Sequence, residues 1–244
     1  MSFIPSCDDR DDAIRSLSEI YGVTSRDIER VLGSSRVKDM ATFGHQIESA
    51  GFRDEVGRQL RASPRGDITH AFYYHSTSYG GCSSWFDEGL HGSSLGVGCF
   101  LDKITELLPP ELHLECRQAA KRIVERRSND EGTTASQCGP YAWNTFTAAS
   151  FSESGQSFRV PEAIRDLGVR SPDGEEVDLP AIIRDRLKPV VVKFKGEITD
   201  IVDYCVTLWG YLLSDDGELH LLHTFHGDGL SIPKEDIVAL IDVS

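Results

Sequence analysis

The chain has 244 residues and a formal net charge of −14, and 39% of its residues are hydrophobic. This hydrophobic content is that of an ordinary globular protein, and no apolar run approaches the roughly 18 residues that a membrane-spanning helix needs. Of the net charge, −1 falls on residues 1–66 (ten basic, eleven acidic) and −13 on residues 67–244. An acidic body repels phosphate backbones, so a nucleic acid is not an expected partner. Because no apolar run is long enough to span a membrane, a membrane is not expected either.

The six cysteines favour reduced thiols rather than a metal centre. They stand at positions 7, 82, 99, 116, 138 and 205. No two of them form a Cys-x-x-Cys pair, and no histidine pair complements them at zinc-finger spacing, so we expect no metal. The first residues, MSFIPSCDDRDD, lack the charged-then-apolar pattern of a signal peptide. We therefore expect a cytoplasmic protein with free thiols.

Residues 1–66 are predicted to form a helical N-terminal extension. Apolar residues recur at helical spacing in three segments, and a fourth helix is expected before the turn at Ser63–Gly66. The first two predicted helices cover approximately 13–21 and 28–32, the third begins near Val37 and ends near Gly51, and the fourth covers roughly 53–62. Thr24 and Asp27 resemble an N-cap pair, and Gly33 should end the second helix.

Residues 67–244 have the mixed pattern of an α+β domain. Strands are predicted at 68–75, 97–101, 190–194, 204–213 and 219–225, with a hairpin turn at Ser214–Gly217 between the last two. Helices are predicted at 83–90 and 110–127, and the final segment, 237–243, is a strand or a short helix. The expected architecture is a mostly antiparallel sheet with inserted helices.

The predicted strand that begins at Ile68 ends in a polar cluster, His75-Ser76-Thr77. A histidine can donate one ring N–H and accept at the other nitrogen, and a hydroxyl two residues later lies on the same face of the strand. Such a pair suits the vicinal hydroxyls of a ribose. The alternative is a histidine bonded to the backbone at the strand end, with Thr77 capping the next helix.

Three segments, taken in order, resemble the histidine-tyrosine-glutamate branch of the ADP-ribosyltransferases. In that family a strand ends in His-x-Thr and a short helix closes on Gly-Leu, which here are His75, Thr77 and Gly89-Leu90. Gly139-Pro140-Tyr141 is similar to the second motif, and Gly229–Ile237 is similar to the closing segment. The resemblance covers residues 67–244 loosely. A closer-lying alternative for the second motif, Gly96–Phe100, offers phenylalanine in place of tyrosine.

The resemblance implies NAD as the substrate. His75 would hydrogen-bond the adenosine ribose, and a backbone group near Ser76 would hold the carboxamide. Tyr141, which follows Gly139 in the second motif, would stack on the nicotinamide ring. Cleavage of the nicotinamide–ribose bond passes through a positively charged state, beside which the family places a glutamate. The corresponding stretch here, 223–226, reads His-Thr-Phe-His. Transfer of ADP-ribose to a protein, hydrolysis of NAD, and binding without turnover all stay open.

A second resemblance is centred on Cys138. Gln137-Cys138-Gly139-Pro140 is similar to the nucleophile region of papain-like cysteine peptidases, in which a helix N-terminus stabilises the thiolate and a glutamine supplies an oxyanion donor. Residues 189–192 and 206–211 resemble the strands that carry the base in that fold. Asp203, Tyr204 and Cys205 stand at the usual place of the histidine, so His223 or His226 would have to serve as the base from elsewhere. The structural alternative for Cys138 is a small buried residue at a tight turn.

A third possibility is a protein without catalytic activity. In that case the acidic chain would bind a protein partner through its N-terminal helices.

Overall fold

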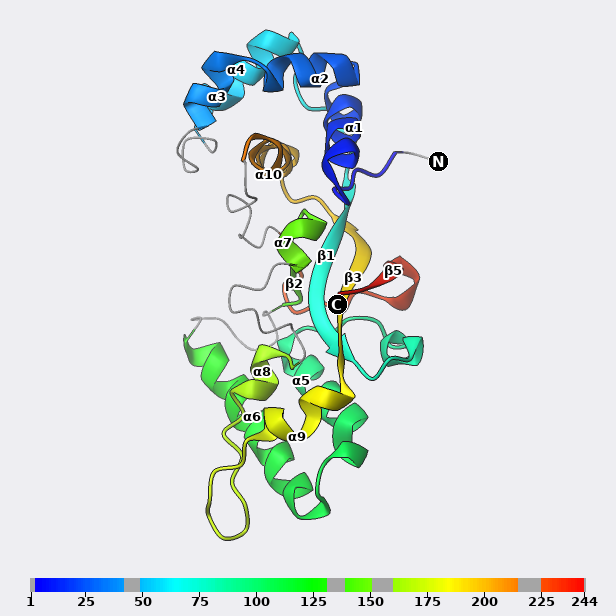
Figure 1. Cartoon of the computed structure of the whole chain (residues 1–244), viewed down its shortest axis with the longest axis vertical. Coiled ribbons are helices and arrows are strands. Elements are labelled where there is room, and N and C mark those ends of the chain that lie inside the picture. The colour runs from blue at the N-terminus through cyan, green and yellow to red at the C-terminus, as the bar shows by residue number, and fades with distance from the viewer. Residues whose placement is uncertain (1–2, 42–48, 131–138, 151–159, 215–224, 244) are drawn as a thin grey trace. The chain divides into compact units, whose positions relative to one another are not determined.

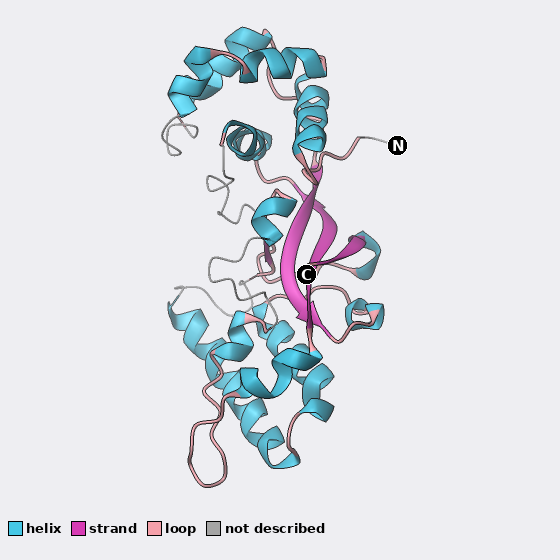
Figure 2. Ribbon diagram, viewed as in Figure 1, coloured by secondary structure: helices cyan, strands magenta, loops and turns pink. Residues whose placement is uncertain are grey.

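The chain has an α+β fold, as predicted (Figure 1). The computed structural model describes residues 3–41, 49–130, 139–150, 160–214 and 225–243. Helices are more abundant than strands in the described residues (Figure 2). The α-helices in the described residues are α1 Arg10–Tyr21, α2 Ser25–Leu32, α3 Ser35–Ala41, α4 Ala50–Leu60, α5 Ser93–Ile104, α6 His113–Asp130, α7 Phe146–Ser150, α8 Glu162–Arg165, α9 Leu179–Ile183 and α10 Ile201–Leu213. The strands are β1 His70–Tyr79, β2 Tyr141–Ala142, β3 Lys188–Glu197, β4 Phe225–His226 and β5 Ile237–Asp242.

The chain forms two compact units. The first comprises Met1–Tyr74, Ala142–Phe151 and Lys195–Phe225, and the second comprises His75–Tyr141, Ser152–Phe194 and His226–Ser244. Strands β1 and β3 therefore contribute residues to both units. The boundary at residue 66 stays a prediction, since residues 1–66 belong to the first unit together with two later segments.

Helices α1, α2 and α4 confirm three of the predicted N-terminal helices, and their caps explain their limits. The third predicted helix is confirmed over Ser35–Ala41 as α3, and residues 42–48 lie outside the described residues. The side chain of Asp9 accepts the backbone N–H of Asp12 at the start of α1, and Gly22 ends that helix in the left-handed conformation. Thr24 and Asp27 form a complete capping box at the start of α2. The apolar faces of these helices bury Leu17 and other residues in the core of the first unit.

The prediction of a strand over 204–213 is wrong, because this segment belongs to α10. The side chain of Asp200 accepts the N–H groups of Val202 and Asp203 and so starts the helix. Leu208 and Trp209 are buried, and the Trp209 ring meets the ring of Tyr21 in α1 edge to face at 6.4 Å. A helix buried on several sides is apolar almost throughout, and its sequence then resembles that of a buried strand. Without its first strand the predicted hairpin is lost; residues 215–224 lie outside the described residues.

The prediction of a strand over 97–101 is also wrong. These residues lie in α5, where Val97, Leu101 and Ile104 are buried on one helical face. The short helix predicted for 83–90 is reduced to a 3-10 helix at Ser83–Phe86. The helix predicted for 110–127 is confirmed as a 3-10 turn at Pro110–Leu112 followed by α6.

Helices form the core of the second unit. Buried residues of α5, α6, α8 and α9 pack together with the connection between α8 and α9. Ile104, Ile164 and Ile183 are at most 1% exposed within this cluster. None of the described helices has both the length and the apolarity needed to cross a membrane.

A three-stranded sheet has the order β1-β3-β5. Strand β3 confirms the predicted buried run at 190–194, and β5 shows that the final segment is a strand. These two strands pair antiparallel, with Val191 opposite Ile241 and Lys193 opposite Ala239. A separate two-stranded sheet joins β2 to β4.

Candidate functional site

His75 of β1 makes a short hydrogen bond to the backbone of the predicted second motif. Its Nδ1 lies 2.7 Å from the carbonyl oxygen of Tyr141. A carbonyl oxygen can only accept, so Nδ1 carries the proton and Nε2 is the acceptor of the neutral ring. Burial lowers the pKa of His75, and the bond to Tyr141 opposes this effect only in part. His75 is therefore a neutral imidazole at pH 7, with its tautomer set by the backbone.

Tyr141 also contacts His226. The two rings meet edge to face, with centroids 5.3 Å apart and planes at 88°. The pairing of β2 with β4 brings these residues together. We call His75, Tyr141 and His226 the histidine–tyrosine cluster. Its members come from three distant parts of the sequence, and His226 was expected there only as a candidate base for a thiol.

Two of the four residues in the stretch where the resemblance would place a glutamate, 223–226, are described. Residues 223 and 224 lie outside the described residues, Phe225 is buried, and His226 is exposed beside Tyr141. The Phe225 ring packs on the ring of Tyr73, with centroids 4.7 Å apart. Strand β4 thus presents an imidazole to Tyr141, and neither of the two described residues of this stretch is a carboxylate.

Backbone hydrogen bonds fix the second motif against the closing segment. The N–H of Gly227 donates to the carbonyl of Pro140 at 3.0 Å, and the N–H of Gly229 donates to Gly139 at 2.8 Å. A Cβ atom on Gly227 would lie 2.5 Å from Cδ of Pro140, so this close approach requires glycine. Gly139 itself has a φ of 62°, in the left-handed region.

The Gly-Leu pair of the first motif is fixed to the same closing segment. Leu90 and Ile232 exchange two backbone hydrogen bonds, of 2.9 and 2.8 Å. Gly89 has a φ of +83°, and a Cβ there would lie 2.0 Å from the carbonyl oxygen of Ile232. All three segments on which the resemblance rests are therefore joined within the second unit.

Two other predicted site residues follow His75 in β1. Ser76 and Thr77 are both partly exposed, and strand geometry places Thr77 on the same face as His75. The alternative second motif, Gly96–Phe100, lies in α5, and the Phe100 ring packs against Trp85. The alternative motif is therefore helical and does not form a strand beside His75. The carbonyl oxygen of Tyr141, by contrast, is hydrogen-bonded to the His75 ring.

The thiol alternative is only partly described. Gln137, Cys138 and His223 lie outside the described residues. One of the strands expected to carry the base, 206–211, is instead helical and lies in α10. This removes one of the structural features on which the papain-like resemblance was based.

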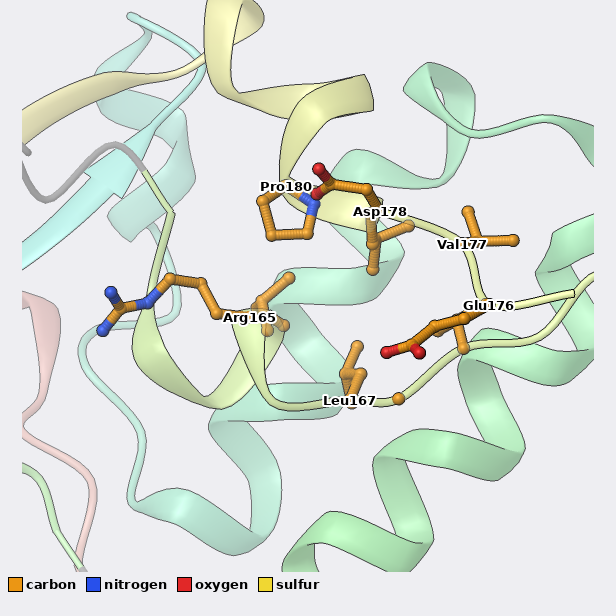
Figure 3. A pocket seen from close by; sticks show the side chains of 10 residues that line it. Arg165, Leu167, Glu176, Val177, Asp178 and Pro180 are labelled. Atoms are coloured by element: carbon orange, nitrogen blue, oxygen red, sulfur yellow. The ribbon is translucent and has the colours of Figure 1, made fainter.

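A pocket of about 390 Å³ opens in the second unit between α8 and α9 (Figure 3). Buried apolar residues, among them Leu167 and Leu179, form its floor. The guanidinium of Arg165 points away from the carboxylates of Glu176 and Asp178 (Figure 3). None of the site residues expected from the sequence lines this pocket.

No protein-family model, curated protein or solved structure matches the chain.

Proposed function

We propose that this protein binds NAD in a pocket built around the histidine–tyrosine cluster, in the manner of the ADP-ribosyltransferases that its motifs resemble. The observation that carries the proposal is the hydrogen bond between His75 and the Tyr141 carbonyl. It joins the first and second motifs, which are 66 residues apart in the sequence. The closing segment contacts both motifs through Gly229 and Ile232, and Gly227, just before it, also bonds to the second motif.

Each member of the site has a role that fits its chemistry. With Nδ1 bonded to the backbone, neutral His75 offers Nε2 as an acceptor for a ribose hydroxyl. Thr77, on the same strand face, adds a hydroxyl that can donate or accept. Tyr141 supplies an aromatic ring for the nicotinamide, and the backbone near Ser76 and Gly139 supplies groups for its carboxamide.

The site is better suited to binding NAD than to cleaving it. Cleavage releases neutral nicotinamide and leaves a ribose oxocarbenium ion, which water or a protein nucleophile then captures with loss of a proton. A carboxylate beside the ribose would stabilise the positive charge. His226 offers no negative charge, so we propose that transfer or hydrolysis by this protein is slow compared with binding.

Calorimetric titration with NAD tests the binding proposal. Wild-type protein should bind NAD saturably, and His75→Ala should weaken the affinity at least tenfold, about 1.4 kcal/mol, because a buried hydrogen-bonding group is lost. His70→Ala is the matched control: His70 is in the same strand, and its Nδ1 contacts Thr69 rather than the second motif.

The thiol alternative gives the opposite pattern. Cys138→Ala should leave NAD affinity unchanged if the proposal is right. Absence of NAD binding by folded wild-type protein would overturn the proposal. Cys138 reacting with iodoacetamide faster than the other five thiols would then favour the thiol hydrolase.

A further inference from the structure

Three metal-ligating side chains converge just after the first motif. Glu88 and His91 lie in the segment that precedes α5, and Cys99 lies in the second turn of that helix. One ligand atom from each residue lies within 4.8 Å of the other two. The cysteine spacing alone indicated no metal centre, because only one of these ligands is a cysteine.

The orientation of His91 is that of a ligating histidine. Its Nδ1 lies 2.8 Å from the hydroxyl oxygen of Ser231. Its Nε2 is buried and has no hydrogen-bond partner among the described residues. Metal-bound histidines characteristically use the second ring nitrogen in a hydrogen bond that fixes the ring. Here Ser231 provides that bond and leaves Nε2 for an ion.

The distance between His91 and Glu88 suits an ion better than a direct hydrogen bond. His91 Nε2 and Glu88 Oε2 are 3.6 Å apart. This exceeds the usual 2.7–3.2 Å of such bonds. Two nitrogen or oxygen ligands on one tetrahedral zinc ion, each bonded at about 2.0–2.1 Å, are roughly 3.4 Å apart. Small side-chain movements would therefore complete the coordination.

The start of α5 places the histidine against the helix. Gly92 is the N-cap residue, and a Cβ on Gly96 would lie 3.2 Å from the carbonyl oxygen of His91. The absence of a side chain at position 96 thus lets the His91 backbone pack closely on the helix. Cys99 follows Gly96 by three residues and so lies on the same helical face.

We propose that Glu88, His91 and Cys99 bind a zinc ion. Imidazole, thiolate and carboxylate are the ligands that zinc takes in proteins, whereas calcium and magnesium prefer oxygen ligands alone. Three protein ligands leave a fourth tetrahedral position for water or another small ligand. The ion would join α5 to the segment before it, and through Ser231 to the closing segment. The simple alternative is an ion pair between protonated His91 and Glu88.

Titration of metal-free protein with Zn²⁺ and with Co²⁺ tests the proposal. We expect one ion per chain and, with Co²⁺, the absorption of a thiolate ligand. Bound zinc should also slow alkylation of Cys99. Cys99→Ser and His91→Ala should each weaken zinc affinity at least 100-fold, and Ser231→Ala should weaken it 10- to 100-fold through the lost support of the ring. Cys82→Ser, which removes an exposed cysteine outside the cluster, should bind as the wild type does.

Several results would overturn the proposal. One is the absence of binding at micromolar zinc, and another is affinity that survives both Cys99→Ser and His91→Ala. If either of these variants fails to fold, Glu88→Gln serves instead, because the Glu88 side chain is 69% exposed and its loss is tolerable for folding. Unchanged zinc affinity in Glu88→Gln and Ser231→Ala would leave only the ion pair as an explanation for the contact.

Discussion

Glu55 is a charged residue with little contact with solvent, and its neighbours explain how it is tolerated. Its side chain in α4 is 5% exposed. Arg58 donates two hydrogen bonds to its carboxylate, of 3.1 and 2.5 Å, and Gln59 donates another of 2.8 Å. The Nε atom of Arg36 lies 3.2 Å from Oε2 of Glu55. The hydrogen bonds from Arg58 and then Gln59 are the main reasons that the pKa of Glu55 falls to about 2.

The stabilisation contributed by the Glu55 charge should depend on pH. Because the pKa is lower in the folded state, this contribution is full above the unfolded pKa of about 4.3 and is lost as pH falls toward 2. Glu55→Gln should therefore destabilise the protein at pH 7, and its deficit should shrink below pH 4. Urea unfolding at several pH values measures this difference. Glu29→Gln, at an exposed position of α2, is the control, and an equal effect of both variants at pH 7 would contradict the account.

In the proposed NAD site, His226 lies beside Tyr141, where a carboxylate would favour cleavage of NAD. His226→Glu places a carboxylate beside Tyr141, where it can stabilise an oxocarbenium ion. We expect the rate of nicotinamide release from NAD to rise about tenfold or more in this variant, since a single well-placed group can contribute 10²–10³. His226→Gln is the uncharged control. A rise in both variants, or in neither while NAD still binds, would show that the carboxylate position is not here.

At the scale of elements, two glycines at the ends of short segments determine how the motifs meet. Gly89 allows Leu90 to pair with Ile232, and Gly227 allows the chain after β4 to lie against Pro140. In both places the neighbouring backbone or ring occupies the position that a Cβ atom would fill. These contacts hold the closing segment against the first and second motifs.

Gly89→Ala should destabilise the second unit and separate Leu90 from Ile232. The left-handed φ alone costs about 1–3 kcal/mol in a residue other than glycine, and the clash with the Ile232 carbonyl adds to this. Gly98→Ala is the matched control, because Gly98 lies in α5 with open space at its Cβ position. The control should be stabilised by up to about 1 kcal/mol, since alanine favours a helix. Equal unfolding midpoints for the two variants would contradict the proposed packing.

The helices and strands could be predicted from the sequence only in part. Helical periodicity and the Thr24–Asp27 capping pair were sufficient for the N-terminal helices. The sequence of α10 resembles that of a buried strand, because burial removes the polar residues that reveal the helical period. In α5 the apolar run Val97–Leu101 is too short to distinguish a helix from a strand. The N-cap residue Asp200 was the signal that could have identified α10.

The site was predictable only in part, because its contacts join segments that lie far apart in the sequence. His75, Thr77 and Tyr141 were identified from local motifs, but the contact of Tyr141 with His226 depends on the pairing of β2 with β4. Pairing of distant short strands leaves no periodic signal in a sequence. The approach of Glu88 and His91 to Cys99 likewise depends on how the chain turns into α5.

At the scale of the whole molecule, charge constrains how an anionic ligand is bound. Residues 67–244 contribute −13 of the net charge of −14, and NAD carries a negatively charged pyrophosphate. Long-range repulsion must then be offset by short-range contacts, such as the ring nitrogen of His75 and backbone N–H groups. At an ionic strength of 0.15 M the repulsion between charges more than about 8 Å apart is largely screened, so a titration with NAD is best made at that ionic strength.

The most direct test of the central claim is a titration of protein with ¹⁵N-labelled histidines, followed by NMR as NAD is added. The account predicts that free His75 is neutral with its proton on Nδ1, and that NAD saturably shifts the Nε2 signal of His75 and the signals of His226. His70 should be unaffected. Unchanged signals for His75 and His226 at millimolar NAD, or shifts confined to other histidines, would contradict the claim that the histidine–tyrosine cluster is a nucleotide site.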